Sequence, residues 1–219
     1  MTSLRSKLTN RLPKERAYGG TGISSTDLEQ LILTEDLKAD ILESIRSEDM
    51  ADVRIAFFFA ENIPAINTNA QFQQCLVSEA LQLLSRSEWG IKQGCFEILG
   101  RYGRQIKSYR ELMLGALADI DPEVRRVALR YYKTYAHDSE IEPLEPFEKD
   151  SYLTEIGMGS HLIYDLRNQA LEIIESVIGK VFTKSEKTEV IKDGNVAFWW
   201  DWKPFHEWKN SWLNKLFRG

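Results

Sequence analysis

The residues that most often perform catalysis or bind metals are few and far apart in this chain. Its three histidines are His137, His161 and His206, and no pair has the spacing that places two imidazoles on one helix face around a metal ion. Cys75 and Cys95 each lie in an apolar, helix-like context without a CxxC spacing, so we interpret both as reduced thiols in the core. No serine occupies a Gly-x-Ser-x-Gly turn. We therefore expect no catalytic residue, no metal site and no cofactor.

Two other stretches contain residue types used in catalysis, but each has a simpler interpretation. Residues 18–25 are rich in glycine and serine, yet they lack the Gly-Lys-Ser/Thr sequence and the preceding strand of a phosphate-binding loop. We interpret them as a surface loop. Residues 138–148 are strongly acidic, but nothing apolar surrounds these carboxyl groups to raise a pKa, as a general acid requires. We interpret them as a solvated connection.

The distribution of charge favours a binding role. Ten acidic and three basic residues lie between 27 and 61, and seven acidic residues and one basic residue lie between 138 and 155. Between 86 and 133 there are ten basic and six acidic residues. A basic middle between two acidic parts would complement a partner protein with a patterned surface. The net charge of −5 opposes general affinity for nucleic acid, which depends on basic groups meeting phosphates.

The elements that would position these residues are predicted to be helices. Asp121 can cap a helix, Pro122 follows at the first helical position, and Val124, Val127 and Ala128 then recur on one face. Similar periodicity and stop signals predict helical segments at 26–45, 50–63, 70–85, 89–102, 109–118, 122–136, 151–157 and 161–178.

Four of these helices share a hydrophobic-basic-x-x-small pattern. Its basic residues are Arg54, Lys92, Arg125 and Arg167, at intervals of 38, 33 and 42 residues. The Asp-Pro-x-Val-Arg-x-x-Ala-Leu sequence of residues 121–129 resembles the second helix of a HEAT repeat. The resemblance implies a right-handed α-solenoid of about four HEAT-like helical hairpins. It also implies that these basic residues are structural, with Asp119 or Asp121 as the acidic partner of Arg125.

The resemblance further points to a binding surface. In HEAT-like folds the second helices line the concave side of the solenoid, which usually carries the binding site. Positions that a stacked core would leave free on these helices are therefore candidate contacts with a partner: Gln93, Glu97, Arg101, Arg126, Arg130 and Lys133. An ordinary solvated face is the alternative interpretation of the same row.

The C-terminal segment departs from the helical pattern. Short stretches of strand-forming residues on either side of Asp193-Gly194 predict a small β-hairpin, and a final amphipathic helix is predicted at 205–217. Five of the six tryptophans lie between 199 and 212. We interpret this segment as an aromatic cap over the last repeat, with Trp200 and Trp202 as candidate aromatic contacts for a partner.

We therefore expect an all-α chain in three parts. These are a basic arm and glycine-rich loop at 1–25, a HEAT-like helical repeat domain at 26–178, and a tryptophan-rich cap at 179–219. No apolar run is long enough to span a membrane and no secretory signal is present, so a cytoplasmic location is predicted.

The function we expect is that of a non-enzymatic protein-binding module. By analogy, its most concrete form is a bacterial immunity or antitoxin-type protein that binds and neutralises a toxin. The alternative is an enzyme resembling the HEAT-like alkylpurine DNA glycosylases, which use a concave basic groove with aromatics and an acid. Arg101, Arg104, Arg126 and Arg130 would suit that enzyme, but the overall acidity opposes it. A regulatory or assembly scaffold is the third interpretation.

Overall fold

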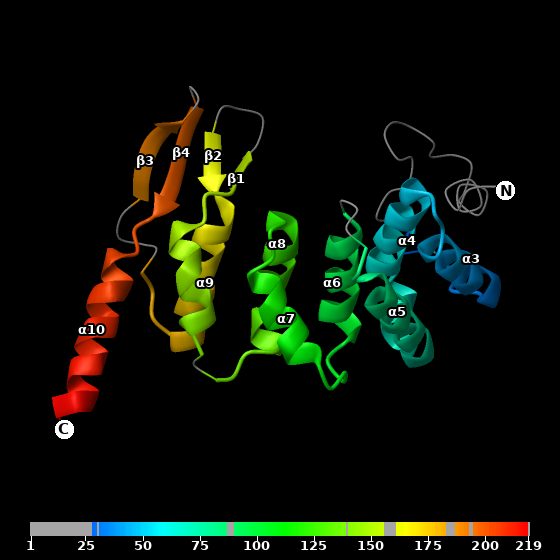
Figure 1. The fold of residues 1–219 in the computed structure, drawn as a ribbon, viewed down its shortest axis with the longest axis horizontal. Helices are drawn as coiled ribbons and strands as arrows, with labels where there is room; N and C mark the ends of the chain where they lie inside the picture. The colour runs from blue at the N-terminus through cyan, green and yellow to red at the C-terminus, as the bar shows by residue number, and fades with distance from the viewer. Residues whose placement is uncertain are drawn as a thin grey trace. The chain divides into compact units, whose positions relative to one another are not determined.

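The computed structural model describes residues 28–29, 31–86, 90–138, 140–155, 161–182, 187–192 and 195–218. The chain is mostly helical and contains a small four-stranded sheet (Figure 1). It divides into two compact units, Met1–Glu111 and Leu112–Gly219. No helix in the described part of the chain is long and apolar enough to cross a membrane. The arm and loop expected at 1–25 lie outside the described residues.

The first unit is built from helices whose starts are marked by capping side chains. Thr34, Asp49 and Asn69 each accept a backbone N–H bond at the start of a helix. The elements are α3 (Glu35–Ile45), α4 (Met50–Asn62), the 3-10 turn η2 (Pro64–Thr68), α5 (Ala70–Leu83) and α6 (Ile91–Tyr102). Helix α7 (Tyr109–Leu117) runs across the division between the units. These bounds confirm the helices predicted between residues 50 and 118.

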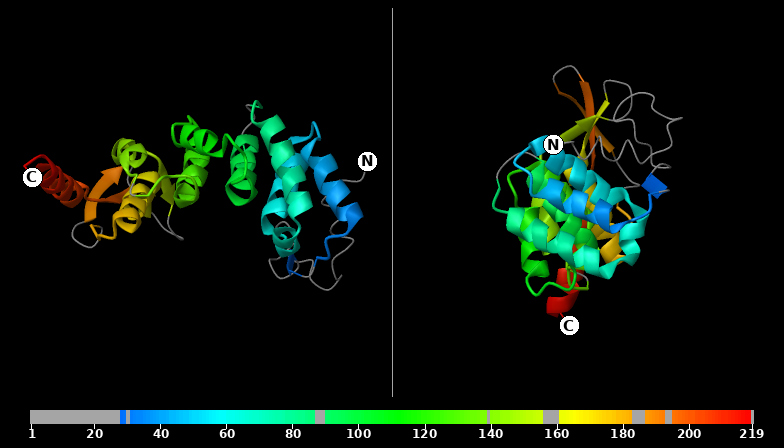
Figure 2. Two further views of the ribbon diagram at one scale, coloured as in Figure 1. Left: turned by 90° about the horizontal axis from the view of Figure 1, so that it is seen from below. Right: turned by 90° about the vertical axis from the view of Figure 1, so that its right-hand side faces the viewer.

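Neighbouring helices of the first unit pack as pairs. Helix α3 packs against α4, α5 packs against α6, and α4 also packs against α6. Both views of Figure 2 show these blue to green helices lying side by side. Leu37 and Ile41 of α3, Val53 of α4, Leu76 of α5 and Ile98 of α6 are fully buried between them. Each helix thus contributes one apolar face to a shared core.

The second unit combines helices with the sheet. Its elements are α8 (Pro122–Arg130), the 3-10 turns η3 (Tyr132–Thr134) and η4 (Glu142–Lys149), β1 (Leu153–Glu155), β2 (His161–Tyr164), α9 (Asp165–Ile178), β3 (Lys187–Lys192), β4 (Asn195–Trp200) and α10 (Lys203–Arg218). The strand order is β1-β2-β4-β3, with β2 and β4 parallel and the other neighbours antiparallel. The predicted hairpin is confirmed as β3–β4, and its turn residues, 193 and 194, lie outside the described residues.

Strands β1 and β2 contradict part of the helical prediction. Residues 153–155 and 161–164 are extended, where helices were expected at 151–157 and 161–178. Strand β2 pairs in parallel with β4, placing Ile163 opposite Phe198, and this distant pairing outweighs the local helical spacing. The chain is therefore mostly helical rather than all-α. Strand β1 lies where the first helix of a fourth HEAT-like hairpin was expected.

Helix α8 has the predicted start but a different ion pair. Asp121 accepts the N–H of Glu123 at 2.9 Å, as a capping residue does. Arg125 donates to the backbone carbonyl of Asp119 at 2.8 Å and to the carboxylate of Asp150 at 2.9 and 3.0 Å. The acid in the preceding turn is therefore not the partner of Arg125, because the end of η4 brings Asp150 to it.

Candidate functional site

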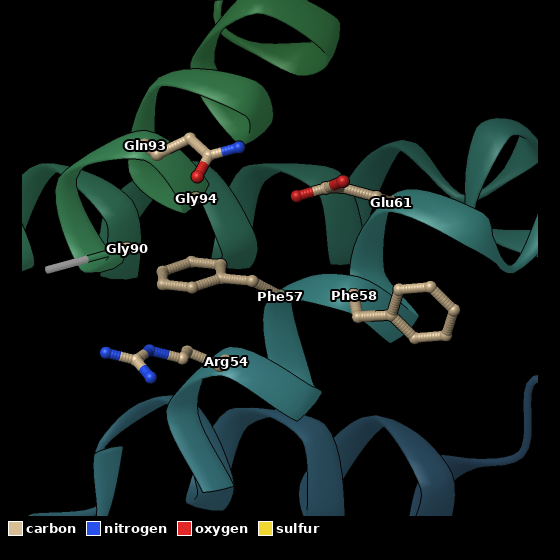
Figure 3. Close-up of a pocket in the computed structure, with 7 residues that line it drawn as sticks. All are labelled: Arg54, Phe57, Phe58, Glu61, Gly90, Gln93 and Gly94. Atoms are coloured by element: carbon tan, nitrogen blue, oxygen red, sulfur yellow. The ribbon is translucent and has the colours of Figure 1, made fainter. Parts of the chain in front are cut away.

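A pocket of about 220 Å³ opens between α4 and α6 in the first unit. Its described lining comprises Arg54, Phe57, Phe58 and Glu61 from α4, and Gly90, Gln93 and Gly94 at the start of α6 (Figure 3). The pocket thus combines aromatic rings, one positive and one negative side chain, an amide and bare backbone. That combination can bind apolar and charged groups of a ligand at the same time.

Two of three consecutive phenylalanines on α4 provide the aromatic part of this pocket. Successive helical residues point about 100° apart, so three in a row do not all face the core. Phe57 and Phe59 are buried, whereas Phe58 keeps 43% of its surface exposed. The Phe58 ring packs edge-on against Phe59, with 5.7 Å between the ring centroids. Phe57 therefore forms a buried floor, and Phe58 forms an exposed rim.

Opposite charges lie at the two ends of the pocket. Arg54 and Glu61 are seven residues apart on α4, so they share one face of the helix and are separated by about 10 Å along its axis. In Figure 3 they lie on opposite sides of the Phe57 ring. Arg54 is exposed and Glu61 is partly exposed, so a ligand can reach both. Gln93 faces the Glu61 end from α6 (Figure 3).

Two glycines at the start of α6 shape the opposite wall. A Cβ atom at Gly94 would lie 2.4 Å from Cδ2 and 2.6 Å from Cγ of Phe57, well inside contact distance. Gly90 has a φ of 82°, a left-handed conformation that favours glycine, and a Cβ there would lie 3.2 Å from Nε of Arg54. The close approach of α6 to α4 therefore depends on glycine at 94, and the conformation before α6 favours glycine at 90.

The sequence-predicted contacts in the first unit are only partly accessible. Gln93 lines the pocket and Arg101 is exposed near the end of α6. Glu97, however, is only 2% exposed, so the prediction that it lies on a free face is wrong. Every residue of α6 from Gly94 to Gly100 is buried, because α6 packs against both α4 and α5. The predicted row is therefore interrupted.

The predicted contacts in the second unit differ in their accessibility. Arg130 and Lys133 are exposed. Arg126 is partly buried, pairs with Glu123 and lies 3.7 Å from the carboxylate of Asp165. Its guanidinium therefore links the start of α8 to the start of α9, which makes Arg126 a structural residue as well as a candidate contact.

The two tryptophans named as candidate aromatic contacts also differ. Trp202 is only 1% exposed and packs edge-on against Phe205, with 5.8 Å between the centroids, so it is a core residue rather than a contact. Trp200 is partly exposed on β4, and its backbone N–H donates to the side-chain oxygen of Asn168 at 2.9 Å. Trp212 on α10 is far more exposed than either.

The two cysteines are free thiols in different surroundings. Cys95 is fully buried in α6, and burial raises the pKa of its thiol to about 12. Cys75 is exposed on α5, which corrects the expectation that both thiols lie in the core. Within the described ranges, no three histidine, cysteine, aspartate or glutamate side chains gather in a way that could hold a metal ion.

Sequence reasoning missed most of the pocket, although two signals pointed to it. The run from Phe57 to Phe59 spans more than one face of a helix, which favours exposure of at least one ring. Gly90 and Gly94, one helical turn apart, mark a place where a neighbouring element comes close.

Comparison with protein-family models, with curated proteins and with solved structures finds no match to this chain. Its function must therefore be inferred from its own geometry.

Proposed function

We propose that this chain is a non-enzymatic protein-binding module that holds its partner at the α4–α6 pocket. The observation that carries the proposal is the exposed Phe58 ring beside the buried floor of Phe57, between two opposite charges. Exposed aromatic side chains at the edge of a concavity are typical anchors of protein interfaces. Covering such a ring contributes about 25 cal/mol for each Å² of apolar surface removed from water.

The size and chemistry of the pocket favour binding over catalysis. Sites for small molecules and cofactors usually have volumes of roughly 300–1,000 Å³. The volume here is about 220 Å³, which suits one side chain of a protein partner better than a cofactor. Among the described residues that line it, Glu61 is of a type that can act as a base, but no histidine, cysteine, serine or lysine accompanies it.

The helical pairs support a HEAT-like arrangement. Helices α3 with α4 and α5 with α6 are two successive hairpins, and α4 packs against α6 as the second helices of stacked repeats do. We propose that the same stacking of hairpins makes the helical part of the chain a HEAT-like solenoid, with the binding site on the second helix of each hairpin. The most concrete form of the proposal, by analogy, is a bacterial cytoplasmic immunity protein that blocks a toxin.

Affinity purification from cells of the native host tests the proposal. The wild-type chain is compared with Phe58→Ala and with Ile32→Ala, an exposed apolar residue of the same unit that does not line the pocket. We expect one stoichiometric protein partner that the wild type and Ile32→Ala retain and Phe58→Ala loses. Circular dichroism checks that all three are folded.

Two results would contradict the proposal. One is the absence of any stoichiometric protein partner, and the other is equal retention of that partner by Phe58→Ala. The immunity form has its own test. The partner identified by the purification, when expressed in bacteria without this chain, should arrest their growth. Co-expression of this chain should restore growth.

A further inference from the structure

We infer that the α4–α6 pocket takes a short segment of the partner in which one apolar side chain lies between an acidic and a basic side chain. This inference rests on the proposed function and specifies the chemistry of the partner. It follows from the order of groups along α4, which is Arg54, then the Phe57 and Phe58 rings, then Glu61. A complementary segment presents the opposite order of charges around an apolar centre.

The charged ends of the pocket select different groups. The planar guanidinium of Arg54 binds a carboxylate through two parallel N–H bonds. The carboxylate of Glu61 accepts hydrogen bonds from lysine or arginine. Gln93, which faces the Glu61 end, offers both an amide N–H and a carbonyl oxygen to the backbone of a bound segment (Figure 3). An apolar side chain then packs between these ends on the rings.

The separation of the charges limits the spacing in the partner. The two residues lie about 10 Å apart along α4. An extended segment with acid, apolar and base at alternate positions places all three on one face, with its ends about 13 Å apart, within reach of long side chains. A helical segment does the same with acid and base seven residues apart. Both forms share one chemistry, because the apolar residue always lies between unlike charges.

The negative charge of Glu61 lies at the C-terminal end of α4, where the helix dipole favours a positive charge. Glu61 lies in the last turn, where the helix dipole disfavours an acid by about 0.3–1 kcal/mol. Departures of this kind are typical of functional positions. They also make the test practical, because Glu61→Lys improves the interaction with the dipole and should leave the helix folded.

Selection from a random dodecapeptide library displayed on phage tests the inference. The library is selected separately on the wild type, on Glu61→Lys and on Arg54→Glu. Glu48→Lys, the same charge change at an exposed position outside the pocket, is the matched control. We expect the wild type and the control to enrich peptides with an acid and a base around an apolar residue. Glu61→Lys should enrich two acids, and Arg54→Glu should enrich two bases.

Binding of one synthetic peptide then gives the size of the effect. A fluorescent peptide with the wild-type selected sequence should bind Glu61→Lys at least tenfold more weakly, as measured by anisotropy, and should bind Glu48→Lys equally well. The inference is overturned if no peptide is enriched, or if the enriched charges are the same on all four proteins. In that case the proposed function still stands if the affinity purification succeeds, and it fails if the protein partner is missing or is retained equally by Phe58→Ala.

Discussion

Replacing Gly94 by alanine should destabilise the first unit by about 2 kcal/mol, although alanine is the better helix former. In an open helix, this change gains about 1 kcal/mol. At Gly94, the new Cβ would lie 2.4–3.1 Å from Cδ2, Cγ and Cβ of Phe57. These atoms lie at the base of the ring, so the whole buried side chain would have to move. Overpacking of this kind costs up to about 3 kcal/mol, which exceeds the helical gain.

Gly115 provides the matched control for this prediction. It lies within α7, is exposed, and no described atom lies within 4 Å of a Cβ built there. Gly115→Ala should therefore stabilise the chain by about 0.5–1 kcal/mol. A Phe57→Leu, Gly94→Ala double variant should lose less stability than the sum of the two single changes, because the smaller side chain leaves room for the new methyl group.

Hydrogen exchange followed by mass spectrometry measures the effect in each unit separately. A loss of 2 kcal/mol should speed exchange of the most protected amides of α4 and α6 by about 30-fold. Exchange in α8 and α9 should stay unchanged. If Gly94→Ala instead slows exchange or raises the melting temperature, as expected for Gly115→Ala, then α6 does not approach Phe57 this closely and Gly94 does not form a wall of the pocket.

Three further outcomes are expected. Alkylation of the native protein at pH 8 should label Cys75 and spare Cys95, whose burial raises its pKa to about 12, and equal labelling by mass spectrometry would argue against this. In urea denaturation, Trp202→Ala should lower the free energy of unfolding by about 3–5 kcal/mol, because Trp202 is only 1% exposed. Trp212 is 49% exposed, so Trp212→Ala should lower it by less than about 1 kcal/mol. Similar losses for the two variants would be inconsistent with these positions. Asp150→Asn should lower the free energy of unfolding by about 1–3 kcal/mol, because it weakens the 2.9 Å ion pair with Arg125. An unchanged midpoint of urea denaturation would show that this ion pair does not stabilise the protein.

Most helices could be predicted because their signals are local. Asp49, Asn69 and Asp121 cap helices within three residues of their own position, and an apolar face follows each of them. Strands β1 and β2 could not be predicted in this way. They contain three and four residues, and the partner of β2 is β4, which lies far along the chain. Leu162 and Ile163 also fit the helical spacing of α9, and short apolar runs are ambiguous between the two structures.

The binding residues were harder to predict than the helices. Gln93, Glu97 and Arg101 follow one another at four-residue spacing, which is also the spacing of a solvated stripe. The structure buries the middle one, because α6 packs against two neighbours. Phe58 and Glu61 could not be assigned to a pocket from spacing alone, since the opposite wall comes from α6, a separate segment.

The parallel pairing of β2 with β4 has a consequence for synthesis of the protein. The first unit ends at residue 111, so all of its packing partners exist before the second unit is made. Strand β2 acquires its parallel neighbour only when the chain reaches residue 200. Strand β2 ends at residue 164, so at usual rates of translation the roughly 36 residues up to the end of β4 take about 2–7 s. During that time β2 has an open edge of the kind that invites pairing with the wrong strand.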